Sequence, residues 1–301
     1  MRGNVLIAGG SGLIGSRLTQ LLLERDYGVA WLSRSRDTKA SFRVWHWDPA
    51  KGTIEKGALD QVQYIINLSG ANVNSRWTDQ RRKLIIDSRV NSTRLLHKTL
   101  REQSGHDVRA YISASGISYY GNSEEEWMTE EVPPANDFLA TCCQRWEEAA
   151  LEIATLGIRT VCVRTGMVFS DQGGALPVLA APVKAGIGAA LGNGQQWVSW
   201  IHIDDICRIY LHALENETMQ GPFNGVAPQP IRNQSLIKGI ARALHKPLWL
   251  PNVPAFALRL VFGEMSSTIL HSTRVSSKRI QDASFRFNFP TPDSALAEIY
   301  G

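Results

Sequence analysis

Residues 5–15 read Val-Leu-Ile-Ala-Gly-Gly-Ser-Gly-Leu-Ile-Gly, and this stretch decides the fold. Its first four residues are apolar and have the length of a buried strand, and the leucines of residues 13–25 recur at helical spacing. Between strand and helix, the glycines satisfy G-x-x-G-x-x-G, counted from Gly9, and G-x-G-x-x-G, counted from Gly10. This order of strand, glycine turn and helix is typical of the first unit of a parallel α/β sheet.

The glycine turn has the properties of a dinucleotide-binding site. Glycine allows a tight turn, a backbone without Cβ that a pyrophosphate can approach, and close packing of the helix on the strand. The amino terminus of the following helix then attracts the phosphate charge. We therefore expect a dinucleotide to contact Gly9, Gly10, Ser11, Gly12, Leu13, Ile14 and Gly15. The alternative is a glycine-rich turn that binds no ligand.

The end of the second predicted strand indicates which dinucleotide binds. A cofactor without a 2′-phosphate favours Asp or Glu there, because a carboxylate accepts hydrogen bonds from the ribose hydroxyls. This chain has Ser33-Arg34-Ser35-Arg36 instead. A guanidinium holds a phosphate through two parallel hydrogen bonds, so we expect NADP(H), with Arg34 as the phosphate ligand. The alternative is that Arg34 and Arg36 are solvated loop charges.

Strand-like and helical segments alternate as far as residue 170. We expect strands at residues 5–8, 28–33, 45–47, 64–68, 110–113 and 160–164, and helices at 13–25, 78–103 and 137–156. The pattern predicts an α/β fold: a Rossmann-like, doubly wound parallel sheet that forms an NADP(H)-binding domain of residues 1–170, to which later segments return.

Glycine and proline become more frequent after residue 170, and the regular alternation ends there. Helical patterns recur at residues 205–214, 233–244 and 255–262. We expect a smaller, mostly α lobe over residues 171–301 that holds a small-molecule substrate.

The composition excludes several classes of protein. The chain has 301 residues, 44% apolar and 20% charged, as in a globular protein, and its net charge of +4 does not indicate a nucleic-acid partner. It shows neither an uninterrupted membrane-spanning stretch nor the features of a signal peptide, so we expect no membrane partner and a cytoplasmic location. The cysteines lack C-x-x-C spacing, so we expect buried free thiols at Cys142, Cys143, Cys162 and Cys207.

Several segments, taken with the glycine turn, resemble the extended or atypical short-chain dehydrogenases/reductases. They are Asn67-Leu68-Ser69-Gly70, Ser113-Ala114-Ser115-Gly116, Tyr119-Tyr120-Gly121 and Trp200-Ile201-His202-Ile203-Asp204-Asp205. More narrowly, the chain is similar to the "epimerase family protein" group, which is related by fold to nucleotide-sugar epimerases. The segments that recur in that group are Arg76-Trp77, Asp87-Ser88-Arg89, Arg145-Trp146-Glu147 and Gly221-Pro222-Phe223-Asn224.

The resemblance covers nearly the whole chain, including a C-terminal region of unknown function at about residues 251–300. It implies an NADP(H)-binding oxidoreductase or epimerase, with a nucleotide sugar among the candidate substrates. Beyond the glycine turn, the residues that it implies at the cofactor are Ser33, Arg34, Leu68, Ser69, Gly70, Arg89 and Val168.

The proton shuttle of these dehydrogenases is missing from the sequence. They use a tyrosine and a lysine four residues later on one helix face, and the lysine lowers the phenol pKa. None of the seven tyrosines here is followed by such a lysine. When Glu147 is aligned with the glutamate that follows the lysine in those enzymes, Leu139 and Cys143 occupy the two positions.

Three residues near the end of the 110–113 strand are candidates for catalysis: Ser115, Tyr119 and Tyr120. A serine there could orient a carbonyl group, and the tyrosines could reach a substrate from the following loop. The alternative is that all three are hydrogen-bonded turn residues.

His202, Asp204 and Asp205 could form an acid/base or metal cluster, but their alternation on an extended stretch favours a structural role. We expect the aspartates to cap a helix that begins near residue 206, and we expect no metal site.

Two functions are consistent with these features. One is an NADP(H)-dependent enzyme that acts on a carbonyl or hydroxyl group. The other is an NADP(H)-dependent binding or regulatory protein without turnover. The oligomeric state stays open.

Overall fold

A computed structural model describes residues 2–35, 40–103 and 105–301, and its main feature is a largely parallel sheet. The eight strands lie in the order β12-β8-β6-β5-β1-β2-β3-β4, and only the β3–β4 pair is antiparallel. The bounds are β1 (Asn4–Ala8), β2 (Gly28–Ser33), β3 (Arg43–Asp48), β4 (Thr53–Ile54), β5 (Tyr64–Asn67), β6 (Ala110–Gly116), β8 (Arg159–Thr165) and β12 (Gly221–Gly225).

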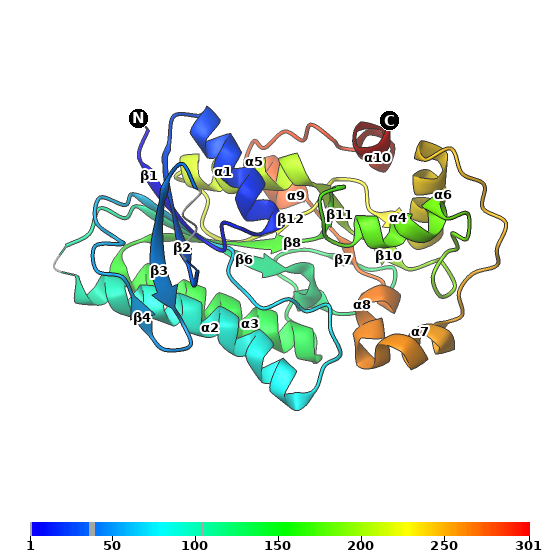
Figure 1. Ribbon diagram of the computed structural model, residues 1–301, viewed down its shortest axis with the longest axis horizontal. Coiled ribbons are helices and arrows are strands. Elements are labelled where there is room, and N and C mark those ends of the chain that lie inside the picture. Colours follow the sequence, from blue (N-terminus) through cyan, green and yellow to red (C-terminus); the bar gives the residue numbers. More distant parts are fainter. Residues whose placement is uncertain (1, 36–39, 104) are drawn as a thin grey trace.

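Helices cover both faces of this sheet (Figure 1). They are α1 (Leu13–Glu24), α2 (Asp79–Glu102), α3 (Phe138–Glu152) and α5 (Ile203–Glu215). The side chains of β1 alternate between the two faces: Val5 and Ile7 lie in the core under α1 and α5, and Leu6 and Ala8 lie in the core under α2 and α3. The three layers confirm the predicted α/β, Rossmann-like sheet.

The structure differs from the sequence-based expectations mainly at the ends of elements. Strand β6 continues to Gly116, and α3 ends at Glu152, where the short 3-10 helix η2 (Ile153–Leu156) follows. The sheet also gains the edge strand β12 from the second half of the chain. Its sequence, Gly-Pro-Phe-Asn-Gly, has no apolar alternation that would predict a strand.

The second half of the chain consists mainly of short elements around a separate core. That core lies between α4, α6 and α10 and buries Trp200, Leu236 and Leu296. The helices are α4 (Leu176–Lys184), α6 (Asn233–Ala243), α7 (Ala255–Phe262), η3 (Gly263–Ser266), α8 (Ser267–Leu270), α9 (Lys278–Asp282) and α10 (Pro292–Tyr300). The remaining elements are η1 (Ile117–Tyr120), β7 (Trp127–Met128), β9 (Met167–Phe169), β10 (Trp197–Val198), β11 (Trp200–His202), β13 (Ile231–Arg232) and β14 (Arg274–Val275).

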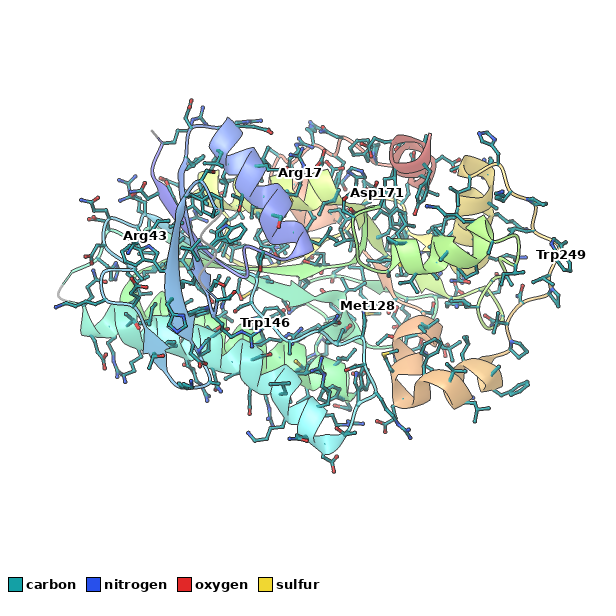
Figure 2. All side chains as sticks on the ribbon, viewed as in Figure 1. Arg17, Arg43, Met128, Trp146, Asp171 and Trp249 are labelled. Atoms are coloured by element: carbon teal, nitrogen blue, oxygen red, sulfur yellow. The ribbon has the colours of Figure 1, made fainter. Side chains whose placement is uncertain are left out.

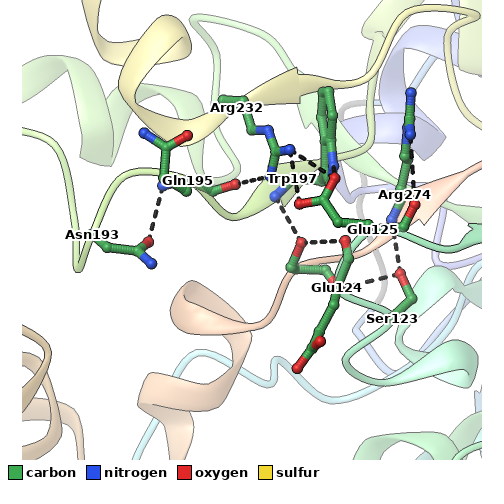
Figure 3. A network of polar contacts seen from close by, with 9 residues as sticks. Ser123, Glu124, Glu125, Asn193, Gln195, Trp197, Arg232 and Arg274 are labelled. Carbon is green, nitrogen blue, oxygen red and sulfur yellow. Dashed lines mark hydrogen bonds and ion pairs between the residues drawn. The ribbon is translucent and has the colours of Figure 1, made fainter.

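A polar cluster joins the C-terminal part of the chain to the segment around β7. Arg232 donates to both carboxylate oxygens of Glu125 at 2.8 Å, and Trp197 Nε1 donates to the same carboxylate at 3.0 Å (Figure 3). The hydrogen bonds from Trp197 and Arg232 lower the pKa of Glu125. The Arg274 guanidinium lies 4.2 Å from the ring centre of Trp127 and 4.6 Å from that of Trp197. Because β7 also pairs with β14, this cluster fixes the C-terminal region beside the sheet.

The glycine turn packs more tightly than any side chain would allow. Gly9 has a φ of +81°, and a Cβ on it would lie 2.9 Å from the backbone carbon of Leu68. A Cβ on Gly10 would lie 2.4 Å from the indole of Trp31, and one on Gly15 would lie 2.4 Å from the carbonyl oxygen of Gly9. These contacts set α1 directly against the end of β1, as the glycine motif predicts.

Replacing Gly15 by alanine is expected to reduce stability by about 1–3 kcal/mol, because the new methyl group meets backbone atoms that cannot move aside freely. Gly173→Ala is the matched control, since its Cβ would contact only the Leu13 methyl groups, at 3.7 and 3.9 Å. Urea unfolding of both variants measures the difference. Equal midpoints for the two variants would show that the turn is not tightly constrained.

Candidate functional site

A cavity of about 440 Å³ lies at the carboxyl ends of the central strands. Gly9 follows β1, Leu68 follows β5, Ser115 belongs to the end of β6, and Thr165 ends β8; all four line the cavity. The strand order reverses between β1 and β5, and doubly wound sheets bind ligands outside this point. The cavity therefore lies where the fold predicts a ligand.

The amino terminus of α1 forms one wall of this cavity and offers it hydrogen-bond donors. Its N-cap is Gly12, so no side chain caps the helix. The N–H groups of the first helical turn have no partner within a helix, and an anion is attracted to them. Gly12 and Leu13 also border a second cavity of about 650 Å³, which Ser11 lines together with Arg17 and Asp171 (both labelled in Figure 2).

Eight of the residues expected at the cofactor line the 440 Å³ cavity. They are Gly9, Gly12, Leu13, Ile14, Gly15, Leu68, Arg89 and Val168. The walls of both cavities leave out the other expected positions apart from Ser11: Gly10, Ser33, Arg34, Ser69 and Gly70.

The expected residues outside the cavity walls have identifiable surroundings. Gly10 packs under Trp31, and the Ser69 hydroxyl donates to the side-chain oxygen of Asn67 at 2.5 Å. Arg34 is exposed just after β2. Arg36 lies outside the described residues. The cofactor role of all these positions stays a prediction.

Arg89 and Trp146 form the wall of the cavity on the side of α2 and α3. Arg89 donates from Nη1 to the carbonyl oxygens of Ala71 and Ile85, at 3.1 and 2.9 Å, and its guanidinium lies 5.0 Å from the centre of the Trp146 ring. A Cβ on Gly70 would lie 2.9 Å from this guanidinium, so the glycine leaves room for it. The Arg89 cation is thus fixed beside the cavity.

Ser115 is the candidate catalytic residue that reaches the cavity, and its hydroxyl is held from behind by a buried ion pair. The hydroxyl donates to Glu147 Oε1 at 2.5 Å. Arg164 grips the same carboxylate with two hydrogen bonds of 2.8 Å, and both side chains are buried. Burial opposes the charge of Arg164, but the hydrogen bonds and the charge of Glu147 outweigh it and raise the pKa of Arg164.

Tyr119 and Tyr120 lie around this ion pair and are absent from the cavity wall. The Arg164 guanidinium lies 3.5 Å from the centre of the Tyr119 ring. The Tyr120 hydroxyl donates to Asn224 Oδ1 at 2.7 Å and accepts from Arg164 Nη1 at 2.9 Å. Burial raises the pKa of Tyr120 to about 12. A phenol in these surroundings stays protonated at neutral pH, and its one proton is already donated.

The two positions aligned with the missing proton shuttle both line the cavity. Leu139 and Cys143 lie one helical turn apart on α3, and the Cys143 thiol lies beside Gly116 at the end of β6. Burial raises the pKa of Cys143 to about 12, so this thiol is neutral and unreactive. Cys142, Cys143, Cys162 and Cys207 are all free and buried, as the sequence predicts.

His202 has the structural role expected for its cluster, but the prediction that Asp204 and Asp205 cap the following helix is wrong. Helix α5 begins at Ile203, and its N-cap is His202, whose Nδ1 accepts from the backbone N–H of Asp204. His202 Nε2 faces Glu298 at 2.9 Å. Asp205 is buried and accepts from the backbone N–H groups of residues 288 and 289. Among the described residues, no group of histidine, cysteine and carboxylate side chains has the arrangement of a metal site.

Sequence reasoning missed the buried ion pair of Glu147 and Arg164 and the cavity residue Tyr210. A signal for Arg164 was present, because an arginine that directly follows the apolar run 161–163 within a strand needs a buried partner. Tyr210 gave no such signal, because it lies on the apolar face of α5 among core residues.

Comparisons with known proteins agree with this fold. Residues 5–224 match the family described as the NAD dependent epimerase/dehydratase family, and residues 253–299 match a domain of unknown function, DUF1731. Over 298 residues the chain is 34% identical to "Epimerase family protein YfhF" of Bacillus subtilis. This match covers 98% of the chain and 97% of the Bacillus protein.

Two solved structures are also similar. Human epimerase family protein SDR39U1, crystallised with NADPH, has a TM-score of 0.87 and 30% identity, with 99% of each chain covered. The nucleoside-diphosphate sugar epimerase from Corynebacterium glutamicum has a TM-score of 0.82 and 30% identity, and covers 100% of this chain and 59% of its own.

The fold and the position of the cavity define a Rossmann-like protein of the kind found in epimerases and dehydratases. The chain belongs to the NAD dependent epimerase/dehydratase family, as an epimerase family protein with a C-terminal DUF1731 domain. The family and the C-terminal region of unknown function are confirmed. In the described residues, no helix has both the length and the apolar character needed to cross a bilayer.

Glu147→Gln is expected to destabilise the protein by about 3–5 kcal/mol, because it leaves the Arg164 guanidinium buried without a counter-charge. Glu148→Gln is the control, since Glu148 is exposed and accepts a hydrogen bond from Gln144 on its own helix. Urea denaturation of both variants gives the comparison. Similar losses in the two would mean that Arg164 is solvated in solution.

Proposed function

We propose that this protein binds NADP(H) along the 440 Å³ cavity and exchanges hydride between that cofactor and a hydroxyl or carbonyl group of a small molecule. The observation that carries the proposal is the uncapped amino terminus of α1, which lines a cavity that extends to Ser115. A pyrophosphate fits the first feature, because it accepts hydrogen bonds from free N–H groups. The close packing of Gly9 and Gly15 sets this helix terminus directly against the ends of β1 and β5, beside the cavity.

Two observations support NADP(H) rather than NAD(H). Arg34 stands exposed after β2, where a carboxylate would favour a ribose without a phosphate. The similar human protein SDR39U1 was crystallised with NADPH. The nucleoside-diphosphate sugar epimerase from Corynebacterium glutamicum supports a nucleotide sugar as the first substrate class to examine.

Ser115 is the residue that we assign to the reacting group, and its geometry determines which partner it takes. A serine hydroxyl has one proton, and Ser115 donates it to Glu147. The lone pairs that remain can only accept, so Ser115 suits a substrate that presents a hydroxyl group. Arg164 holds the Glu147 carboxylate in place and thereby fixes the direction of this hydroxyl. Bound NADP(H) supplies the hydride acceptor or donor.

A second candidate function is an NADP(H)-dependent binding protein without turnover. The observation that favours it is the wall formed by Leu139 and Cys143, which provides no acid or base beside Ser115. The loss of a positioned acid or base lowers a rate by about 10²–10⁴. In this alternative, bound NADP(H) orders the C-terminal lobe for a partner.

Arg34→Ala is expected to weaken NADPH binding about tenfold or more and to leave NADH binding unchanged, because charged hydrogen bonds to the 2′-phosphate are lost. Isothermal titration calorimetry with both cofactors measures this. Arg25→Ala serves as the control, because it removes an exposed arginine at the carboxyl end of α1, away from the glycine turn. Wild-type protein that binds NADPH and NADH with equal affinity would contradict the role of Arg34.

Turnover separates the two candidate functions. With NADP⁺ and a panel of nucleotide sugars and simple alcohols, we expect a substrate-dependent rise in the nicotinamide absorbance. We expect Ser115→Ala to lower this rate about 10-fold or more through lost orientation of the substrate. If NADP⁺ binds but no member of the panel raises the absorbance, the enzyme proposal fails and the binding protein is favoured.

A further inference from the structure

Two residues that line the 440 Å³ cavity each carry a buried polar atom without a hydrogen-bond partner. Within residues 2–35, 40–103 and 105–301, these two unpaired atoms are Trp146 Nε1 and the Tyr210 hydroxyl oxygen. The two residues come from opposite faces of the sheet, Trp146 from α3 and Tyr210 from α5. Buried polar groups are nearly always hydrogen-bonded, so an unpaired group in a cavity wall indicates a ligand or a bound water.

Tyr210 has surroundings that make its unpaired hydroxyl costly. The side chain is fully buried in the core beneath α5, among Ile206, Ile209 and the strands of the sheet. Burial raises the pKa of Tyr210 and outweighs the opposing effect of the Thr165 hydroxyl beside it. Thr165 does not form a hydrogen bond of normal geometry with it. An unpaired buried hydroxyl costs its desolvation free energy, and a hydrogen-bond partner in the cavity would offset that cost.

Trp146 presents a different kind of group. An indole N–H can only donate, so it requires an acceptor. Its ring lies against Arg89, whose Nη1 is occupied by two backbone carbonyl groups. Leu139, Cys143 and Trp146 follow each other at helical spacing on the cavity side of α3. Trp146 is therefore the hydrogen-bond donor on a helix face that is otherwise apolar.

We propose that Trp146 and Tyr210 are positioning residues for the bound dinucleotide, which they hold from opposite walls of the cavity through the indole N–H and the phenol hydroxyl. Trp146 takes an acceptor such as a sugar hydroxyl oxygen, and Tyr210 takes a polar group of the cofactor near the end of β8. This inference rests on the proposed function, because it assumes that NADP(H) occupies the cavity. It adds two contacts that the glycine motif does not predict.

Tyr210→Phe is the sharper test, because it removes one oxygen atom and keeps the ring. We expect NADPH to bind about three- to tenfold more weakly, the range for one lost neutral hydrogen bond. The melting temperature of the ligand-free protein is expected to stay equal or rise, because no hydrogen bond within the protein is lost. A purely structural hydroxyl would give the opposite pattern. Calorimetry with NADPH and thermal unfolding without it provide the two readouts.

Tyr27→Phe is the matched control. Tyr27 is also buried, but its hydroxyl donates to Glu215 at 3.2 Å, and it precedes β2 at the amino ends of the strands, opposite the cavity. This variant is expected to melt lower and to bind NADPH normally. Trp146→Phe tests the second contact and is expected to weaken NADPH binding to a similar degree.

The outcomes distinguish the inference from the function on which it rests. If wild-type protein does not bind NADPH, both fail. If wild-type protein binds NADPH and Tyr210→Phe and Trp146→Phe bind it equally well, the cofactor proposal stands and the positioning role is overturned. An unchanged affinity in only one of the variants removes that residue from the site.

Discussion

The backbone contacts of the glycine turn are the constraint on which the rest of the site depends. Gly15 touches the carbonyl oxygen of Gly9, and Gly9 touches the chain where β5 ends. Because these contacts are between backbone atoms, they set the distance between α1, β1 and β5 without room for adjustment. The first turn of α1 is thereby placed at the gap between β1 and β5, where the strand order reverses. This packing therefore determines the position of the cavity, the N–H groups that line it and its extension to Ser115 at the end of β6.

A buried charge imposes the second constraint, at the end of β8. The Arg164 guanidinium is out of contact with water and must be satisfied by its neighbours. Glu147 supplies the counter-charge, Tyr119 supplies a ring face, and Tyr120 supplies a hydroxyl oxygen. These side chains are committed to Arg164, which is why two of the three candidate catalytic residues lie away from the cavity. Ser115 belongs to the same hydrogen-bond network and is its member at the cavity wall.

The local sequence pattern was sufficient to predict the first strand, the glycine turn and the helices that cover the sheet. The strand at Val5–Ala8, the glycine turn and the helices on both faces follow from apolar spacing and from the special backbone of glycine. The parts that could not be predicted depend on contacts between distant segments. Strand β12 forms because β8 offers it a free edge, and Glu147 meets Arg164 from a different element. His202 caps α5 with its own ring nitrogen, a role that Asp, Asn, Ser and Thr more often fill.

The polar groups of the cavity bear directly on its chemistry. Reduction of a carbonyl requires a proton at oxygen as well as a hydride at carbon. Ser115 already donates its proton to the carboxylate that Arg164 holds in place, and Leu139 and Cys143 do not replace the missing tyrosine and lysine. Oxidation of a hydroxyl group needs an acceptor for its proton, and the lone pairs of Ser115 can orient that hydroxyl. For the proposed enzyme, Ser115 therefore suits the orientation of an alcohol better than the protonation of a ketone.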